Sequence, residues 1–323
     1  MNRLGTSVRR VLFALAGFTL AVAGAQAAPA NVHDGVVIDT ASNVAYTTHP
    51  GSGMRAVDLA SGRELWRSED AAKPLTLVGN DLVAQGAPGP RGELQLAVID
   101  PATGIARYKT AAALPQGIVA RLGAELAGAF VTWAEAGAEG SAVVHWSFEP
   151  STPRGISPDQ PLVEGLATVA SPAAPASRRG SLRLDLTTGT LSPQATAAGN
   201  RPANPLLTEL AGSDSRRFAS VDGRHVLESR RLPAVAGSPN RYRWTVRDGA
   251  TQAVLGQVDA PVSAAPFVVA EGAVLFVTRP TLRKEGDRLV DQALALRALE
   301  LSTGKERFAV TLLDTAFRGP FPP

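Results

Sequence analysis

Cysteine is absent from the 323-residue sequence. Its absence excludes disulfide bonds, thiolate metal ligands, a cysteine nucleophile and a lipid attached to an N-terminal cysteine. A chain of this length can bury a hydrophobic core without covalent cross-links. We therefore expect a protein whose stability comes from core packing.

Long apolar runs are also missing, because the longest one covers only residues 11–23 (VLFALAGFTLAVA). This run is too short for a transmembrane helix, which needs about 20 apolar residues, but it suits the core of a signal peptide. Arg3, Arg9 and Arg10 precede it, an A-x-A cleavage site follows at Ala25–Ala27, and no acidic residue occurs before Asp34. The sequence predicts a signal peptide at residues 1–27 and a periplasmic or secreted mature chain of residues 28–323. The Arg9–Arg10 pair also resembles a twin-arginine signal, so the export route stays open.

The excess of positive charge belongs to this leader. The whole chain has a formal net charge of +3, and the leader contributes three arginines and no acids, so the mature chain has none. We therefore expect neither nucleic acid nor an anionic membrane as a partner. One local group of arginines remains and is interpreted as a solvated strand face of mixed charge. Its members are Arg216, Arg217, Arg224, Arg230, Arg231, Arg241, Arg243 and Arg247.

A short phrase recurs along the mature chain: an alternating apolar stretch, then Asp, two residues, Thr or Ser, and Gly. The fullest copy is Ala56–Trp66 (AVDLASGRELW), and others cover residues 97–104, 182–189, 298–304 and, in degenerate form, 244–251. The Asp side chain can accept a hydrogen bond from the backbone two residues on, and Gly tolerates the left-handed conformation. Each phrase therefore predicts a β-hairpin.

A second pair of short strands precedes several of these hairpins. The expected pairs are residues 35–39 with 44–48, 74–78 with 82–85, and 267–270 with 274–277. Four meandering strands form one propeller blade, and the 42 residues from Gly62 to Gly104 match the length of such a blade. The 85 residues from Gly104 to Gly189 correspond to two units, which predicts a blade without the phrase within residues 112–150. We expect an all-β fold, a single β-propeller of four-stranded antiparallel blades, five to seven in number.

At these residues the chain resembles the pyrroloquinoline-quinone-like, or quinoprotein-like, β-propeller repeat family, whose blades carry A-x-D-x-x-T-G-x-x-x-W. Trp66 takes the aromatic position in the fullest copy, and Tyr108 and Phe308 take it in the second and last copies. The resemblance implies that these rings pack between blades. The family includes dehydrogenases that hold the quinone over calcium and non-catalytic members such as the propeller lipoprotein of the outer-membrane protein assembly machine. Without cysteine or a recognisable calcium-binding cluster, the resemblance favours the non-catalytic branch without a cofactor.

Few residues stand in patterns that carry catalytic or metal chemistry. His33, His49, His145 and His225 are too far apart for a local metal motif, and no G-x-S-x-G motif occurs. Prolines in the loop of residues 86–92 remove the N–H donors that a phosphate-binding loop needs. The place of Asp58, Asp100 and Asp185 in the turn phrase accounts for them, and Trp133, Trp146 and Trp244 are expected in the core. No catalytic, cofactor-binding or metal-binding residue is predicted.

A proline-rich insertion at about residues 148–180 interrupts the strand pattern with six prolines. Prolines exclude regular strands, although residues 161–170 could form a short helix. A loop of this length is either functional or a passive linker, and Arg178–Arg179 at its exit could contact an acidic partner.

The sequence thus predicts an exported, non-enzymatic propeller that acts as a protein-interaction scaffold in the cell envelope. Its expected partner is another envelope protein, with the 148–180 loop as one candidate contact, and no membrane span is expected in the mature chain. Two alternatives remain: a quinone- or metal-dependent oxidoreductase, and a propeller that binds a ligand or glycan in a central pocket lined by Trp133, Trp146 or Trp244. The C-terminal end, residues 318–323, lacks a further strand and is expected only to brace the first blade.

Overall fold

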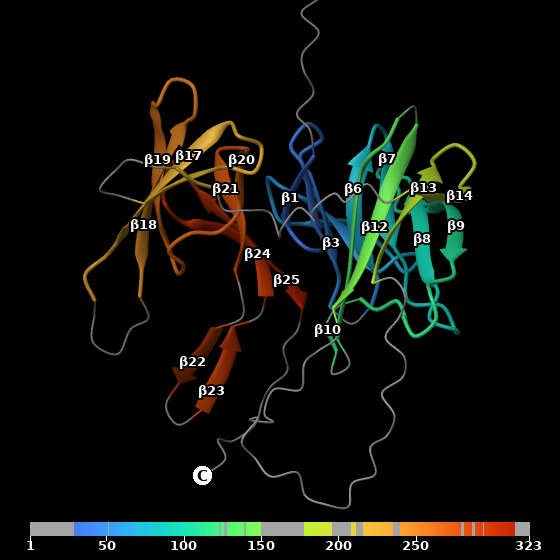
Figure 1. Ribbon diagram of the computed structural model, residues 1–323. Coiled ribbons are helices and arrows are strands. Elements are labelled where there is room, and N and C mark those ends of the chain that lie inside the picture. The colour runs from blue at the N-terminus through green and yellow to red at the C-terminus, as the bar shows by residue number, and fades with distance from the viewer. Residues whose placement is uncertain are drawn as a thin grey trace, which may run out of the picture.

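The computed structural model describes residues 29–50, 52–122, 124–125, 128–138, 140–149, 178–195, 208–210, 216–234, 240–278, 281–285, 288–292 and 294–313. Within these ranges every regular element is a β-strand, and the strands form antiparallel sheets (Figure 1). The predicted signal peptide and most of the proline-rich insertion lie outside them. The described part of the chain holds no helix with the length and apolarity needed to cross a bilayer.

Five sheets of four or five strands form the blades, each a meander of strands consecutive in the chain except where a hairpin is inserted. Blade 1 contains β1 (Ala30–His33), β2 (Val36–Asp39), β3 (Val44–Thr48), β4 (Met54–Asp58) and β5 (Glu64–Ser68). Blade 2 contains β6 (Lys73–Val78), β7 (Asp81–Gln85), β8 (Leu94–Ile99) and β9 (Ala106–Ala112). Blade 3 contains β10 (Ala124–Glu125), β11 (Gly128–Ala136), β12 (Ser141–Glu149), β13 (Arg179–Asp185) and β14 (Leu191–Gln194).

The remaining strands form the C-terminal half of the molecule. Blade 4 contains β15 (Thr208–Leu210), β16 (Arg216–Ala219), β17 (His225–Arg231), β18 (Tyr242–Asp248) and β19 (Val254–Ala260). Blade 5 contains β20 (Phe267–Ala270), β21 (Ala273–Thr278), β24 (Leu294–Glu300) and β25 (Glu306–Leu313), and the hairpin of β22 (Thr281–Glu285) and β23 (Arg288–Gln292) is inserted between β21 and β24. The fold is an all-β, multi-bladed propeller, and its five described blades lie within the predicted range.

One predicted blade does not exist as a separate unit. The strands between residues 112 and 150, β10, β11 and β12, belong to blade 3, because β12 pairs with β13, which leads into the Asp185 turn. The expected proline-rich insertion therefore separates two neighbouring strands of one blade. Spacing suggested an additional unit here because an insertion inside a blade lengthens the period as much as an additional blade would.

The predicted hairpin turns are present. The Asp58 carboxylate accepts a hydrogen bond of 2.7 Å from the Ser61 N–H, and Gly62 closes the turn at φ +73°. The degenerate copy differs in one detail: its left-handed residue is Gln252, at φ +59°, and not Gly249. Gln252 stands four positions after Asp248, as Gly62 does after Asp58, so the turn geometry is kept without glycine.

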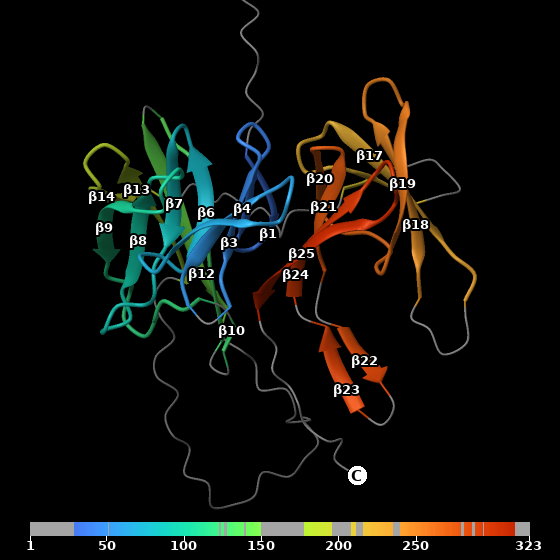
Figure 2. The same ribbon diagram turned by 180° about the vertical axis from the view of Figure 1, so that it is seen from behind.

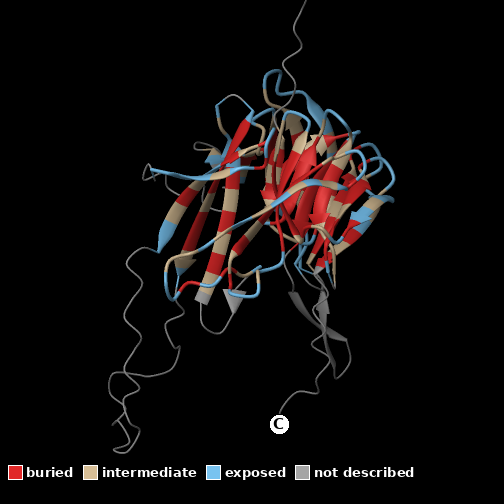
Figure 3. Cartoon of the chain, turned by 90° about the vertical axis from the view of Figure 1, so that its right-hand side faces the viewer, coloured by how far each residue is buried: buried red, intermediate tan, exposed pale blue. Residues whose placement is uncertain are grey.

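Hydrophobic clusters show which blades are neighbours. Separate clusters join blade 1 to blade 2, blade 1 to blade 5, blade 2 to blade 3, and blade 4 to blade 5. No cluster of described residues joins blade 3 to blade 4, and Figures 1 and 2 show these two blades at opposite ends of the arrangement. The described blades thus form an open arc. Figure 3 shows that buried positions run through the strands between blades, whereas exposed positions follow the turns and outer strands.

The first and last blades along the chain, blades 1 and 5, are neighbours but share no strand. Every strand of blade 1 comes from residues 30–68, and β25 completes blade 5. The Thr48 hydroxyl donates to the Leu312 carbonyl oxygen at 3.4 Å, and Arg55 donates to that of Thr311. The last described strand therefore braces the first blade. Residues 318–323 lie outside the described residues.

Candidate functional site

A repeated contact joins the last strand of one blade to the hairpin turn of the next blade. We call the acid that opens each hairpin the turn acid, the residue four positions later the turn residue, and the residue eight positions later the lock residue. In blade 1 the lock residue is Trp66, and its Nε1 donates a 2.9 Å hydrogen bond to the Pro101 carbonyl oxygen of blade 2. Its ring covers Gly104, the turn residue of blade 2, so closely that a Cβ there would lie 2.5 Å from the indole.

The same contact occurs at two further junctions. Tyr108 of blade 2 covers Gly189 of blade 3, where an added Cβ would lie 2.7 Å from the Tyr108 side chain. Phe308 of blade 5 covers Gly62 of blade 1, with the corresponding distance at 2.5 Å. Blade 4 has Gly256 as its lock residue, and a Cβ there would lie 2.2 Å from the Leu301 carbonyl oxygen of blade 5, so these backbones meet directly. The packing of aromatic residues between blades, implied by the sequence resemblance, is confirmed at three junctions.

The junction from blade 3 to blade 4 lacks both halves of this contact. The lock residue of blade 3 is Pro193, which is exposed. The turn residue of blade 4 is Gln252, and its side-chain oxygen accepts a 2.7 Å hydrogen bond from Arg217. The open side of the arc therefore coincides with the junction where neither blade carries the locking residue type.

The face of blade 4 that points away from blade 5 is rich in arginine. Cross-strand register places Arg217 beside Glu228, and Arg230 beside Arg243 and Asp259. The opposite face carries Phe218, Leu227 and Trp244, which pack against blade 5. We call the polar side the arginine face; its cations are Arg217, Arg230, Arg241, Arg243 and Arg247, and its carboxylates are Glu228 and Asp259.

Most of these arginines have partners, yet positive charge remains in excess. Asp259 binds Arg243 at 2.9 Å and Arg241 at 3.0 Å, and the hydrogen bond from Arg243 is the main reason why the pKa of Asp259 is lowered. Arg247 lies 3.4 Å from Glu228. Arg230 is exposed and has no hydrogen-bond or ion-pair partner among the described residues. The predicted strand face of mixed charge is therefore present, with an excess of cations that the sequence interpretation had not assigned to one side.

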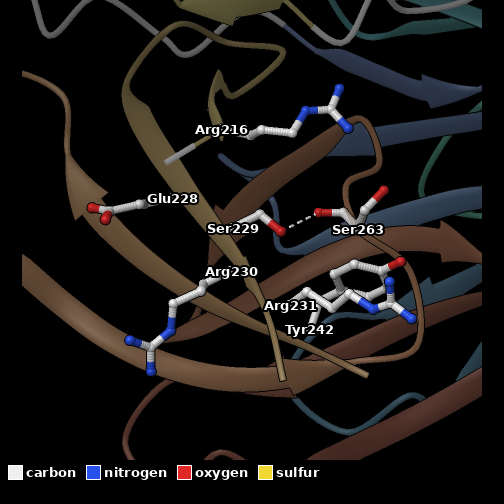
Figure 4. A pocket seen from close by; sticks show the side chains of 7 residues that line it. All are labelled: Arg216, Glu228, Ser229, Arg230, Arg231, Tyr242 and Ser263. Carbon is white, nitrogen blue, oxygen red and sulfur yellow. Dashed lines mark hydrogen bonds between the residues drawn. The ribbon is translucent and has the colours of Figure 1, made fainter. Parts of the chain in front are cut away.

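A hollow of about 620 Å³ lies beside β17. It is lined by Arg216, Glu228, Ser229, Arg230, Arg231, Tyr242 and Ser263. Figure 4 shows Ser229 pointing toward Ser263, while the Glu228 and Arg230 side chains leave β17 on its opposite side. The Ser229 hydroxyl donates to the Ser263 carbonyl oxygen at 2.5 Å. Cations thus line both sides of β17, so blade 4 presents positive charge in more than one direction.

The hollow's own cations are partly neutralised. Glu209 holds the Arg216 guanidinium through two hydrogen bonds of 3.0 and 3.2 Å, which raises the pKa of Arg216 and lowers that of Glu209. Arg231 donates to the Asn240 side-chain oxygen at 2.7 Å. We therefore place the more available positive charge on the arginine face, around Arg230.

The residues considered from sequence are distributed as follows. Trp146 and Trp244 are buried, as predicted, and Trp244 donates 3.1 Å hydrogen bonds to the Val262 and Ser263 carbonyl oxygens. Trp133 is partly exposed and not in the core, contrary to the prediction. Trp146 and Trp244 belong to different hydrophobic clusters, so the three tryptophans do not line one central pocket. Asp58, Asp100 and Asp185 serve their turns. The four histidines come from three different blades, and no group of three potential metal ligands occurs among the described residues.

The fold and its repeated turns define the class of protein as a multi-bladed all-β propeller. No family model matches the sequence, and no curated protein matches it. Among solved structures, BamB from Moraxella catarrhalis shares 13% identity over 86% of this chain and 63% of its own, with a TM-score of 0.28. TolB from Acinetobacter baumannii shares 15% identity over 87% of this chain and 53% of its own, at a TM-score of 0.25.

A europium-containing methanol dehydrogenase is similar at the same level, with 12% identity over 87% of this chain and 69% of that enzyme at a TM-score of 0.26. The chain therefore spans less than two thirds of BamB and about half of TolB. One of these three neighbours is an enzyme, and likeness at this level assigns no function.

Proposed function

We propose that the chain is an exported, non-catalytic propeller of the quinoprotein-like type that acts as a protein-interaction scaffold in the cell envelope. Its partner binds on the open side of the arc, between blades 3 and 4. The observation that carries this proposal concerns the junction of blades 3 and 4, whose described residues share no hydrophobic cluster. Its lock position holds Pro193 instead of an aromatic residue, and its turn position holds Gln252 instead of glycine.

The charge of the arginine face favours binding of a hydrophilic partner over packing against another blade. Packing another blade against the arginine face would bury Arg230 without a counter-ion, and an unpaired buried charge costs several kcal/mol. A partner that supplies carboxylates would instead compensate the excess cations and be steered toward them. The partner segment is therefore acidic.

The proline-rich insertion starts and ends on blade 3, next to the proposed partner site. Its two ends are held together on blade 3, because the Phe148 N–H donates a 2.8 Å hydrogen bond to the Arg178 carbonyl oxygen. Blade 3 borders the open side, so a partner bound there can reach the insertion. Contact with the insertion remains part of the proposal, as does a mature chain beginning near Ala28.

Charge reversal on the arginine face tests this proposal. Arg217→Glu/Arg230→Glu alters two cations that form no ion pair with a carboxylate in the described part of the chain, so the fold should persist, with an unchanged circular dichroism spectrum. Crosslinking capture from native cell envelopes should yield a discrete acidic partner with the wild-type chain and lose it at least tenfold with this variant. The matched control is Arg63→Glu/Lys305→Glu on exposed turns of blades 1 and 5, which should capture normally. Capture that survives the first variant, or fails equally with both, contradicts the proposal.

A further inference from the structure

A chain of polar side chains crosses the face of blade 3 that points away from blade 2. Register places Trp133 of β11, His145 of β12 and Ser181 of β13 side by side in one row. Nδ1 of His145 lies 2.8 Å from the Ser181 hydroxyl, and Nε2 lies 3.2 Å from a carboxylate oxygen of Glu135. The Trp133 and His145 rings stack, with centroids 5.2 Å apart and planes at 18°.

Serine, histidine and a carboxylate in contact are also the groups of a nucleophilic triad, but this geometry does not suit acyl transfer. Ser181 lies in the middle of β13, which pairs with β12 on one side and with β14 on the other. The backbone amides around its hydroxyl are therefore used within the sheet and cannot form an oxyanion hole. The row is better suited to holding a ligand than to cleaving one.

A second observation points to a ligand on the same face. Ser147 stands two residues beyond His145 on β12, is 6% exposed, and its hydroxyl has no hydrogen-bond partner among the described residues. Leaving a buried hydroxyl unpaired is unfavourable, so buried polar groups normally have partners. An unpaired hydroxyl beside an ordered polar row indicates a position that a ligand hydroxyl can complete.

We propose that this row, Trp133, Glu135, His145 and Ser181 together with Ser147, binds a neutral saccharide. The two stacked rings offer an apolar shelf, and the surrounding groups offer both donors and acceptors, which the C–H faces and hydroxyls of a sugar require. Glu135 is well exposed at the end of the row and disfavours an anionic ligand. The buried hydroxyls of Ser147 and Ser181 disfavour a purely apolar ligand.

The inference is independent of the partner proposed for blade 4 and has its own test. Wild-type protein is titrated with cellotetraose, maltotetraose and chitotetraose, each up to about 10 mM, by calorimetry. At least one should bind saturably, and Trp133→Ala and Glu135→Gln should each weaken that binding at least tenfold. Trp66→Phe and Glu64→Gln, the matched changes on blade 1, should leave it within twofold.

Ser147→Ala separates a ligand contact from a purely structural hydroxyl. A ligand contact predicts weaker saccharide binding at unchanged or higher thermal stability, because the variant removes an unpaired buried group. Binding within twofold of wild type would remove Ser147 from the site. The proposal is overturned if none of the three saccharides binds, or if binding survives Trp133→Ala but is lost in Arg217→Glu/Arg230→Glu, which would place the ligand on the arginine face.

Discussion

The indole Nε1 of Trp66 donates its hydrogen bond to the Pro101 carbonyl oxygen, so the outermost strand of blade 1 is fastened to the turn of blade 2. The contact combines one directional bond with close packing of the ring on Gly104. Since the chain has no disulfides, contacts of this kind and the hydrophobic clusters between blades hold the arc together.

Truncating Trp66 should separate the two components of this contact. Trp66→Ala removes both the packing and the hydrogen bond and should lower the free energy of unfolding by about 3 kcal/mol, whereas Trp66→Phe keeps most of the packing and should cost about 1 kcal/mol. Urea unfolding followed by circular dichroism measures both. Equal losses in the two variants would show that the hydrogen bond, and not the ring, dominates.

Gly104 provides the complementary experiment from the other side of the same contact. Gly104→Ala adds a Cβ at φ +75° and 2.5 Å from the Trp66 ring, whereas Gly79→Ala adds one at φ +59° with no atom within 4 Å. Both should lose about 1 kcal/mol to backbone strain, and Gly104→Ala should lose about 2 kcal/mol more to overpacking.

The pair of variants has an internal check. In a Trp66→Ala background the additional loss at Gly104 should largely disappear, because the atoms that the new methyl group meets are gone. If Gly104→Ala costs no more than Gly79→Ala in the wild-type background, the lock does not constrain that turn.

The sequence was informative about local structure and less so about arrangement. The turn phrase predicted the Asp58 and Asp185 hairpins because their signals are local: one side-chain acceptor and one left-handed residue. The extent of blade 3 was missed because the insertion between β12 and β13 hides the pairing of strands far apart in sequence. The sequence shows that Pro193 and Gln252 depart from the turn phrase, but only the structure shows that they belong to the same junction.

The candidate sites were harder to find for a related reason. Trp133, Glu135, His145 and Ser181 match no linear motif, because they meet across three strands, and Ser181 is separated from the others by the insertion. The arginines between residues 216 and 247 were visible in the sequence, but their division between the two sides of β17 depends on strand alternation.

Lys73 of blade 2 contacts both neighbouring blades. Its ammonium group is almost fully buried and donates to Asp34 of blade 1 at 3.0 Å and to the Thr132 carbonyl oxygen of blade 3 at 3.3 Å. Asp34→Ala should destabilise the protein more than Lys73→Met, by roughly 3 against 2 kcal/mol, because it leaves the buried cation without its counter-ion, whereas Asp34 is 42% exposed and can be solvated alone. Thermal and urea unfolding of both variants measure the order, and the reverse order would contradict this account of the contact.

Asp222 should make stability depend on pH in the acidic range. Burial, the largest single effect, would raise its pKa, but the His225 imidazole 3.9 Å away, the Ser220 hydroxyl and the Arg224 N–H together lower it to about 2. A folded-state pKa below the unfolded value of 3.8 means that the unfolded chain takes up the proton first. The stabilisation is therefore complete above about pH 4 and is lost as the pH falls through 2.

Asp222→Asn tests this sign directly. The variant keeps the shape but not the charge, so it should be less stable than wild type by about 1–2 kcal/mol at pH 7, allowing for solvent screening of a partly exposed group. The difference should shrink between pH 4 and pH 2, because the wild-type carboxylate then becomes protonated as well. Glu69→Gln, at an exposed position between blades 1 and 2, serves as the control and should show no such convergence. A constant difference across this range would mean that Asp222 acts through the shape of its turn and not through its charge.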